Sequence, residues 1–467
     1  MKTKKHAHLI GIAGAGMSAL AVLLKKSGWI VSGSDSGFYE PTAGYLKKNK
    51  INFHKKYDVN NIPKDVDLIV IGNHSELKRA KNKEAKRAFN LGKEIMSLPE
   101  ALAMLSKKTK NIVIAGSYGK STCTALISYA LEKAKKDPSY FIGAIPINME
   151  SSSRLGKGRD FVLEGDEYPS ANWDRTSKFL YFNPASVLLI SVTHDHVNMF
   201  PTEKLYKEPY KKLVEKIPEN GLLVYNNKEK AVQEIAKNID CRKISYSLNN
   251  KKGWYAKNIK YGKITSFDLM RYSKKIINLK TRLLGNHNIE NIIGAGALLL
   301  ENKKIKAKDF ARAVASFQGI KRRIELKNPG SKIPTYEGFG SSYDKARVIF
   351  DALKLHFPKK RIVVVFEPHT FSWRNYKALK WYKDVFENVG EVVLLPPPIH
   401  GKNTHSQLTY NDIYHEIKKH LPVHKAKTEK EALKILKKII KTGDIIALVS
   451  SGSLLGLSKS IPKLFDK

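Results

Sequence analysis

A strand, a glycine turn and a helix follow one another in a short stretch of the chain, and this stretch most constrains the fold. Residues 111–124 read N-I-V-I-A-G-S-Y-G-K-S-T-C-T, and an apolar helical pattern follows them. Glycines allow backbone N–H groups to point at phosphate oxygens, and the amino end of a helix adds partial positive charge. We therefore predict a nucleotide phosphate loop, in which Lys120 reaches the outer phosphates and Ser121 binds Mg²⁺.

This loop is shorter than the eight-residue form of the motif. Ile114 stands where that form has its first glycine, and the turn itself is Gly-Ser-Tyr-Gly. The alternative interpretation is a plain glycine turn followed by an incidental lysine. The strand before the turn and the helix after it favour the phosphate loop.

The length and composition set the broad class. A chain of 467 residues is long enough for about three domains. The two cysteines, Cys123 and Cys241, are far apart and have no neighbouring Cys or His, so they predict neither a disulfide framework nor a zinc site. Glycines interrupt the apolar run near the N-terminus, and no apolar run approaches the length of a membrane span. We expect a cytoplasmic protein without a signal peptide or a transmembrane helix.

The net charge of +40, from 83 Lys+Arg against 43 Asp+Glu, is the unusual compositional feature. A nucleic-acid-binding protein or an enzyme of polyanionic substrates would have such a charge. The lysines are spread along the whole chain, however, and no single basic cluster is interleaved with aromatic residues. This spread favours solvated lysine-rich surfaces, and we expect no specific nucleic-acid partner.

The first block of the chain reads as a nucleotide-binding βαβ unit. Residues 6–16, H-A-H-L-I-G-I-A-G-A-G, predict a strand that enters a glycine turn, and a second strand ends near Asp35. An acidic residue at this place can accept hydrogen bonds from a ribose or a base. The alternative is that Asp35 is a turn residue, because Ser-Asp-Ser-Gly is also good turn chemistry.

The second block brings acidic and imidazole groups to the ends of strands. A strand at 160–163 leads to E-G-D-E-Y, which begins at Glu164, and a long apolar strand leads to T-H-D-H, which ends at His196. Carboxyl ends of strands beside a phosphate loop are where Mg²⁺ and a γ-phosphate lie in such folds. Glu164 is a natural magnesium ligand, and His196 is a less usual one. His194 and His196 can also be ordinary hydrogen-bonded histidines at a strand end.

Two later motifs offer contacts to the nucleotide. Asn288 precedes a helix predicted from Ile289 to Leu300, so it either caps that helix or, with His287, touches a base or the metal. G-I-K-R-R, which ends at Arg323, places paired arginines where they can face a transferred phosphate; the alternative is a solvated basic pair. The remaining chain again alternates strands and helices, including a helix near 376–387 and a strand at 445–449, and we predict an α/β fold in three blocks.

These motifs occur in an order and with separations that resemble the Mur ligase family of cell-wall synthesis. The motifs are the phosphate loop, E-G-D-E-Y, D-H-V-N-M-F-P, L-L-G-N-H-N and G-I-K-R-R-I-E, and the resemblance covers essentially the whole chain. It implies three domains, namely a Rossmann-like UDP-binding domain at 1–107, a central P-loop ATPase-like domain at 108–323 and a C-terminal Rossmann-like peptide-binding domain at 324–467. It also implies an ATP-dependent amide ligase whose cofactors are ATP and Mg²⁺.

The resemblance assigns roles to individual residues. The UDP substrate would contact Gly14, Gly16 and Asp35. Lys120, Glu164 and His196 would be catalytic, and Ser121, Glu164 and His196 would hold the metal. The nucleotide contacts would be Gly116, Gly119, Lys120, Ser121, Thr122, Asn288 and Arg323. Lys211 matches a lysine that some members carbamylate, but this branch commonly lacks that group, so Lys211 is left out of the site.

The opening motifs, H-L-I-G-I-A-G-A-G-M-S and G-S-D-S-G-F-Y-E-P, are most similar to the branch that recycles peptidoglycan. Enzymes of this branch join UDP-N-acetylmuramate to the tripeptide L-alanyl-γ-D-glutamyl-meso-diaminopimelate through an acyl phosphate. The alternatives are ligation of UDP-N-acetylmuramate to L-alanine, and a relative that binds nucleotide without turnover.

One segment departs from the family pattern. Where the family usually has D-D-F-A-H-H-P, residues 337–343 read E-G-F-G-S-S-Y, so the second acid and both histidines are absent. These groups would help the third domain meet ATP and the incoming peptide. We hypothesise from sequence order that His369, in E-P-H-T, supplies an imidazole in their place. The acceptor and the oligomeric state are not predicted by the sequence.

Overall fold

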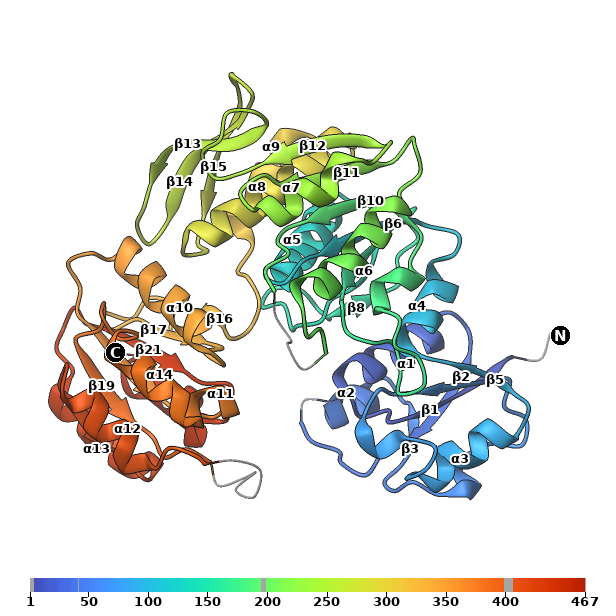
Figure 1. The fold of residues 1–467 in the computed structure, drawn as a ribbon, viewed down its shortest axis with the longest axis horizontal. Helices are drawn as coiled ribbons and strands as arrows, with labels where there is room; N and C mark the ends of the chain where they lie inside the picture. Colours follow the sequence, from blue (N-terminus) through green and yellow to red (C-terminus); the bar gives the residue numbers. More distant parts are fainter. Residues whose placement is uncertain (1–3, 41, 195–198, 399–405, 467) are drawn as a thin grey trace. The chain divides into compact units, whose positions relative to one another are not determined.

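The computed structural model describes residues 4–40, 42–194, 199–398 and 406–466. In these residues helices alternate with mostly parallel strands, and the strands form three sheets (Figure 1). The chain divides into two compact units. The first comprises residues 1–257, 268–279 and 290–317, and the second comprises 258–267, 280–289 and 318–467. The predicted α/β class is confirmed.

The first sheet belongs to the first unit and has the strand order β3-β2-β1-β4-β5, all parallel. Its strands are β1 (His6–Ile10), β2 (Ile30–Ser34), β3 (Asn52–His54), β4 (Leu68–Ile71) and β5 (Glu94–Met96). The helices that connect them are α1 (Ala15–Lys26), α2 (Thr42–Lys48), α3 (Lys83–Asn90) and α4 (Leu98–Ser106). The chain runs outward from β1 to β3 and then returns to the other side of β1. Ligands of doubly wound sheets bind at such a switch point, and the glycine turn after β1 lies there.

The second sheet has the strand order β15-β14-β13-β12-β11-β10-β6-β9-β7-β8. Its strands are β6 (Lys110–Ala115), β7 (Ser139–Phe141), β8 (Ser153–Arg154), β9 (Asp160–Gly165), β10 (Pro184–Leu189), β11 (Leu222–Asn226), β12 (Arg242–Tyr246), β13 (Trp254–Lys260), β14 (Thr265–Arg271) and β15 (Lys274–Thr281). The helices of this region are α5 (Lys120–Lys133), α6 (Glu203–Glu215), α7 (Lys230–Lys237), α8 (Asn286–Glu301) and α9 (Ala307–Ser316). Because β6 pairs in parallel with both β9 and β10, the carboxyl ends of these three strands meet at one edge.

The third sheet belongs to the second unit and has the order β16-β17-β21-β18-β19-β20. Its strands are β16 (Arg323–Leu326), β17 (Thr335–Gly338), β18 (Ile362–Phe366), β19 (Glu391–Leu394), β20 (Val423–Lys425) and β21 (Ile445–Val449). Only the β16–β17 pair is antiparallel among the described pairs of this sheet. Its helices are α10 (Tyr343–His356), α11 (Phe371–Arg374), α12 (Tyr410–Lys418), α13 (Glu429–Ile439) and α14 (Leu457–Leu464).

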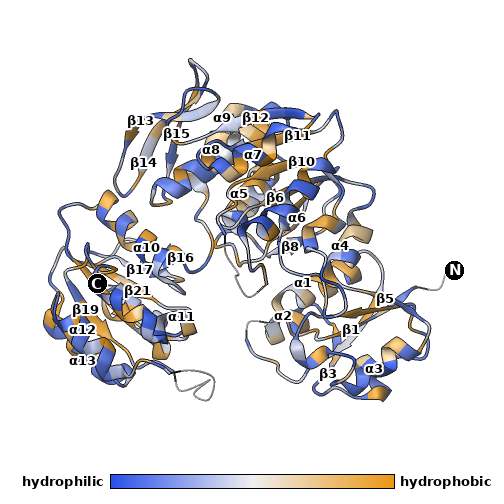
Figure 2. Ribbon diagram, viewed as in Figure 1, coloured by the Kyte–Doolittle hydropathy of each residue, from blue (hydrophilic) through white to orange (hydrophobic). Residues whose placement is uncertain are grey.

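The central strands of each sheet are apolar because helices cover both of their faces. β18 and β21 are buried along their whole length, and so is β4 in the first sheet. Figure 2 shows the same pattern, with hydrophobic strands inside and hydrophilic outer helix faces. Parallel strands that are covered on both faces are expected to be continuous apolar runs. Such runs therefore mark the central strands in the sequence.

Two predicted elements differ from the structure. α8 begins at Asn286, three residues before the predicted start at Ile289. Residues 376–383 form a 3₁₀ helix where we expected an α-helix near 376–387. Among the described residues, no helix combines the length and the apolar character that crossing a membrane requires.

Candidate active site

The predicted phosphate loop lies between β6 and α5, and its two glycines are required by the backbone. Gly116 has φ +146° and Gly119 has φ +82°. A Cβ at Gly116 would lie 2.8 Å from the backbone nitrogen of Ser191, and a Cβ at Gly119 would lie 2.7 Å from Oδ1 of Asn291. Side chains are therefore excluded at both positions, by conformation and by space.

The loop is anchored on the segment that follows β10. The backbone N–H of Ser117 donates to the Ser191 carbonyl oxygen at 3.0 Å, and the N–H of Tyr118 donates to Ser191 Oγ at 3.1 Å. The hydroxyl of Ser117 donates to the carbonyl oxygen of Thr193 at 2.7 Å. These bonds hold the loop at the carboxyl edge of β6 and β10.

Lys120 is the first residue of α5, and its ammonium group forms an ion pair with Glu167. Lys120 Nζ lies 2.6 Å from Glu167 Oε2, and the two side chains are 14% and 1% exposed. Glu167 comes from the segment directly after β9, which neighbours β6. The amino end of α5 thus carries the loop lysine in a defined position.

Ser121 and Glu164 lie together beside this lysine. Ser121 Oγ donates to Glu164 Oε1 at 2.8 Å, and the N–H of Gly143 donates to Glu164 Oε2 at 2.6 Å. Burial raises the pKa of Glu164, against the hydrogen bonds from Gly143 and Ser121 and the charge of Lys120. The half-buried carboxylate of Glu164 and the Ser121 hydroxyl offer hard oxygen ligands, and Mg²⁺ uses one or two protein oxygens while it keeps several waters. The pair fits a magnesium ion.

Asp166, the second acid of E-G-D-E-Y, has a partner of its own. Asp166 Oδ2 accepts a hydrogen bond from Lys178 Nζ at 2.6 Å. Burial raises the pKa of Asp166, but the charges of Lys178 and Lys120 outweigh it, so the pKa lies below its usual value. The three carboxylates of E-G-D-E-Y therefore contact different groups.

The predicted metal ligand His196 lies outside the described residues. Its neighbour His194 is described, and its Nε2 lies 2.7 Å from the carbonyl oxygen of Phe200, while its ring packs on Tyr206. His194 therefore has a structural role. Thr122 is half-buried in the first turn of α5. No group of three His, Cys, Asp or Glu side chains that could hold a metal occurs among the described residues.

The predicted UDP contacts lie after the carboxyl ends of β1 and β2. Gly14 caps α1, and a Cβ at Gly16 would lie 2.9 Å from Leu98 Cδ1. Asp35 Oδ2 accepts the N–H of Ala13 at 2.9 Å. Its Oδ1 accepts the Tyr57 hydroxyl and the N–H groups of Ser36 and Gly37. Asp35 thus holds the glycine loop in place, and its direct contact with UDP stays a prediction.

Asn288 and Arg323 belong to the second unit. Because α8 begins at Asn286, Asn288 lies inside the helix and does not cap it, so that expectation is wrong. Asn288 is buried, and its Nδ2 donates to the Leu284 carbonyl oxygen at 2.8 Å. Arg323 is exposed, and its guanidinium lies 5.8 Å from the centre of the Phe339 ring. Their contacts with nucleotide stay predictions.

The loop before Asn288 is held by a histidine of α10. The N–H of Gly285 donates to His356 Nε2 at 2.8 Å, and His356 Nδ1 lies 2.9 Å from the carbonyl oxygen of Gly262. Burial lowers the pKa of His356. It also lowers the pKa of His287 to about 4, with further lowering by the charges of Arg323 and His356.

The segment at 337–343, which departs from the family pattern, is held by ion pairs within the second unit. Glu337 lies 3.1 Å from Arg322 Nε and from Lys327 Nζ. Arg322 also donates to the carbonyl oxygens of Ser450 and Gly452, both at 2.8 Å. This arginine therefore stabilises the loop after β21. His369 Nδ1 lies 3.4 Å from Glu367 Oε1, and its proposed role as a substitute imidazole stays a hypothesis.

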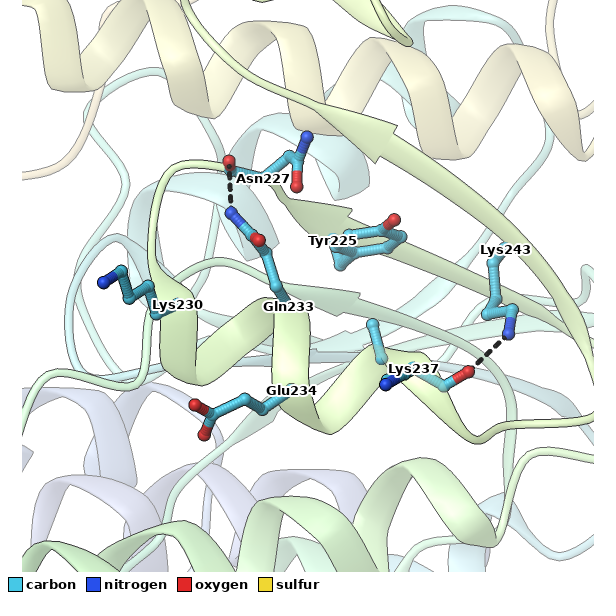
Figure 3. Close-up of a pocket in the computed structure, with 8 residues that line it drawn as sticks. Tyr225, Asn227, Lys230, Gln233, Glu234, Lys237 and Lys243 are labelled. Carbon is cyan, nitrogen blue, oxygen red and sulfur yellow. Dashed lines mark hydrogen bonds between the residues drawn. The ribbon is translucent and has the colours of Figure 1, made fainter.

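A groove of about 610 Å³ lies elsewhere on the first unit, between β11, β12 and α7 (Figure 3). Its lining is lysine-rich and shares no residue with the phosphate loop; it consists of Tyr225, Asn227, Lys230, Gln233, Glu234, Ala236, Lys237 and Lys243. Lys243 Nζ donates to the carbonyl oxygen of Lys237, so two residues of this lining are hydrogen-bonded to each other. The groove carries none of the predicted site residues.

Two residues of the site were missed by the sequence prediction. Glu167 lies in the quoted E-G-D-E-Y motif, but only the folded chain shows that it meets Lys120. Asn291 is buried against Gly119, although it is 172 positions away in the chain. Its signal is the spacing N-x-x-N from Asn288, which places both side chains near one face of a helix.

The sequence matches two family descriptions. Residues 6–110 match the Mur ligase family catalytic domain, and residues 114–299 match the Mur ligase middle domain. The UDP-N-acetylmuramate–L-alanine ligase of Dictyoglomus turgidum is 30% identical over 464 residues, which are 97% of this chain and 96% of that protein.

A second relative is the Haemophilus influenzae ligase that joins UDP-N-acetylmuramate to L-alanyl-γ-D-glutamyl-meso-2,6-diaminoheptandioate. It is 27% identical over 368 residues, which are 78% of this chain and 80% of that protein. Among solved structures, the UDP-N-acetylmuramate–alanine ligase of Thermotoga maritima has the same fold, with a TM-score of 0.77 and 21% identity over 98% of each chain. Members of this family are ATP-dependent amide ligases. The chain belongs to the Mur ligase family.

Proposed function

We propose that this protein joins the carboxyl group of UDP-N-acetylmuramate to the tripeptide L-alanyl-γ-D-glutamyl-meso-diaminopimelate, in peptidoglycan recycling. The observation that carries the proposal is the arrangement around the glycine loop. Lys120 and Ser121 begin α5, and the Ser121 hydroxyl donates a hydrogen bond to Glu164. These groups suit a bound nucleoside triphosphate, in a family whose members couple ATP to amide formation.

The proposed reaction has two steps. A carboxylate oxygen of the muramate attacks the γ-phosphorus of ATP, and the bond to the β-phosphate oxygen breaks, which gives ADP and an acyl phosphate. The peptide amine then attacks the acyl carbon, loses a proton, and releases inorganic phosphate as the amide forms. In phosphoryl transfer the side chains take little part in covalent chemistry, so positioning and charge neutralisation supply most of the catalysis.

The residues of the loop would have different roles in phosphate binding and charge neutralisation. The backbone N–H groups of Gly119 and of the first turn of α5 would bind phosphate oxygens, and Lys120 would neutralise charge that develops on the transferred group. Ser121 and Glu164 would hold Mg²⁺, which would neutralise phosphate charge when it is bound. We propose His196 as a further ligand.

We also propose the three domains predicted above, with boundaries at 107/108 and 323/324, and a cytoplasmic location, where ATP is available. The first domain would present UDP-N-acetylmuramate, and the third would present the acceptor. Closure of such domains would protect the acyl phosphate from water.

Ligation to L-alanine is the second candidate. The similarity to the Dictyoglomus turgidum alanine ligase covers more of this chain than the similarity to the Haemophilus influenzae peptide ligase, 97% against 78%. The opening motifs support the peptide acceptor, whereas this coverage supports alanine.

A competition experiment separates the two candidates. The purified protein receives ATP, Mg²⁺ and UDP-N-acetylmuramate with equal concentrations of the tripeptide and L-alanine, and mass spectrometry identifies the product. We expect the tripeptide product to dominate by tenfold or more in kcat/KM, which corresponds to about 1.4 kcal/mol of transition-state discrimination. A dominant alanine product would contradict the peptide assignment and support the second candidate.

A further inference from the structure

Glu167 is the carboxylate of E-G-D-E-Y whose role neither the motif nor the family comparison assigns. It is 1% exposed, and a charged side chain is almost never so deeply buried unless it is paired. Its partner is the loop lysine, with 2.6 Å between Glu167 Oε2 and Lys120 Nζ. The chain therefore places a buried negative charge directly behind the group that would meet the phosphates.

A tyrosine from α6 holds this carboxylate. The Tyr206 hydroxyl donates to Glu167 Oε1 at 3.5 Å, and it lies 2.9 Å from Ser117 Oγ and 3.1 Å from the Tyr210 hydroxyl. The Tyr206 ring is fully buried and packs edge-on against Phe200 at 5.3 Å. One side chain thus contacts the loop itself, through Ser117, and the anion that fixes the loop lysine.

The neighbouring acids of the motif have other hydrogen-bond partners, whereas Glu167 pairs with Lys120. Glu164 accepts hydrogen bonds from Ser121 and Gly143, and Asp166 pairs with Lys178. A lysine side chain loses much rotamer entropy when it is fixed, and it has three donors on its ammonium group. A carboxylate that accepts one donor fixes the stem of the side chain and leaves the remaining donors for a ligand.

We propose that Glu167 is a positioning residue, which holds Lys120 in the orientation that binds the β- and γ-phosphates of ATP and is itself oriented by Tyr206. The inference rests on the proposed function, because it needs Lys120 to bind a nucleoside triphosphate. Preorganisation of this kind improves affinity by reducing the entropy lost on binding. Glu167 acts through Lys120, so its effect must vanish when Lys120 is absent.

A double-mutant cycle tests this dependence. MgATP binding is measured by titration calorimetry, without UDP-N-acetylmuramate or acceptor, for the wild type, Glu167→Gln, Lys120→Gln and the double variant. We expect Glu167→Gln to weaken MgATP binding about tenfold in the wild-type background and less than about twofold in the Lys120→Gln background. Equal losses in both backgrounds would show a merely structural role and overturn the inference.

Two further variants distinguish a loss of positioning from a general loss of folding. Tyr206→Phe keeps the carboxylate and the packed ring but removes the hydroxyl, and we expect a loss of about two- to fivefold that again depends on Lys120. Asp160→Asn is the matched control, because Asp160 is a buried acid on the strand that precedes Glu167, and it also pairs with a lysine, Lys304. It begins β9, whereas Glu167 follows the end of that strand, so we expect its effect to be the same in both Lys120 backgrounds.

The outcomes separate the inference from the proposed function. A wild-type protein that binds MgATP, with no coupling between position 120 and either position 167 or position 206, would overturn the inference alone. A wild-type protein that binds no MgATP would contradict the proposed function and the inference with it.

Discussion

At the scale of single residues, Gly119 shows how closely the phosphate loop is fitted to its surroundings. Its φ of +82° is unfavourable for other residues, and Asn291 Oδ1 occupies the space that a side chain would need. Asn291 is 4% exposed and comes from the middle of α8. The loop conformation therefore depends on a helix that follows it much later in the chain.

We expect Gly119→Ala to reduce MgATP affinity by at least tenfold, because the loop must move to accept a methyl group. The positive φ alone costs about 1–2 kcal/mol of folding free energy. Titration calorimetry measures the affinity, and thermal unfolding measures the stability.

Gly92→Ala is the matched control for this prediction. Gly92 also has a positive φ, +63°, but a Cβ there would meet nothing within 4 Å. We expect a similar backbone penalty without any loss of MgATP affinity. Equal losses of affinity in the two variants would contradict the role of the loop geometry.

The residue scale also shows how far the sequence predicts the site. Lys120, Ser121 and the loop glycines could be predicted, because their geometry is local to one strand, turn and helix. Glu167 and Asn291 could not, because their contacts with the loop depend on which strands are neighbours and on where α8 packs. Asp35 was predicted at the correct turn, but its four internal hydrogen bonds depend on the folded glycine loop and on Tyr57.

At the scale of elements, α3 is fixed to the first sheet by one buried carboxylate. Glu84 is fully buried, and its Oε1 lies 2.8 Å from His8 Nε2 of β1 and 2.7 Å from Ser34 Oγ of β2. Its Oε2 accepts the Asp58 N–H and the Asn61 amide. Glu84 therefore connects the helix to two strands and to the segment between β3 and β4.

We expect Glu84→Ala to destabilise the protein by about 3–5 kcal/mol, because it leaves several buried donors unpaired. Glu94→Ala is the control, since Glu94 is an exposed acid on β5 of the same sheet, and its loss should change stability by less than about 0.5 kcal/mol. Chemical denaturation followed by circular dichroism distinguishes the two. A loss below 1 kcal/mol for Glu84→Ala would contradict the anchoring role.

His287 makes the stability of the second unit depend on pH. Burial, with the charges of Arg323 and His356, lowers its pKa from 6.5 to about 4 in the folded protein. The unfolded chain therefore binds a proton between pH 6.5 and 4 that the folded chain does not. Stability is lost as the pH falls through this window, by at most ~1.4 kcal/mol per pH unit for one histidine.

His287→Gln removes this proton uptake, so we expect its unfolding midpoint to fall less steeply between pH 6.5 and 4. Melting curves at several pH values measure the difference between the two proteins. Parallel pH profiles would contradict the assignment to His287.

Elements were predicted well where the apolar pattern is long. β21 occupies the predicted 445–449, and α5 follows the predicted loop. The start of α8 was misplaced, because the sequence signal at Asn288 suggested a cap whereas the helix begins behind Gly285, which has φ +91°. The 3₁₀ helix at 376–383 was not predicted, because the choice between 3₁₀ and α geometry depends on packing around Trp373 and Tyr382, both fully buried.

At the scale of the whole molecule, three sheets carry three sets of predicted contacts. The first carries the glycine loop with Asp35, the second carries the phosphate loop with its acids, and the third carries the altered segment at 337–343 with His369. The sequence predicted this division, because each block repeats the alternation of strands and helices. The acceptor specificity was not predicted, because its segment departs from the family pattern.

Release of inorganic phosphate from ATP tests the central claim most directly. The protein is assayed with Mg²⁺ and ATP, with UDP-N-acetylmuramate and the tripeptide added alone and together, beside a Lys120→Gln variant. We predict release only when both substrates are present, and loss of at least about 100-fold in kcat for the variant. Release that does not depend on UDP-N-acetylmuramate, or a fully active Lys120→Gln variant, would contradict the account.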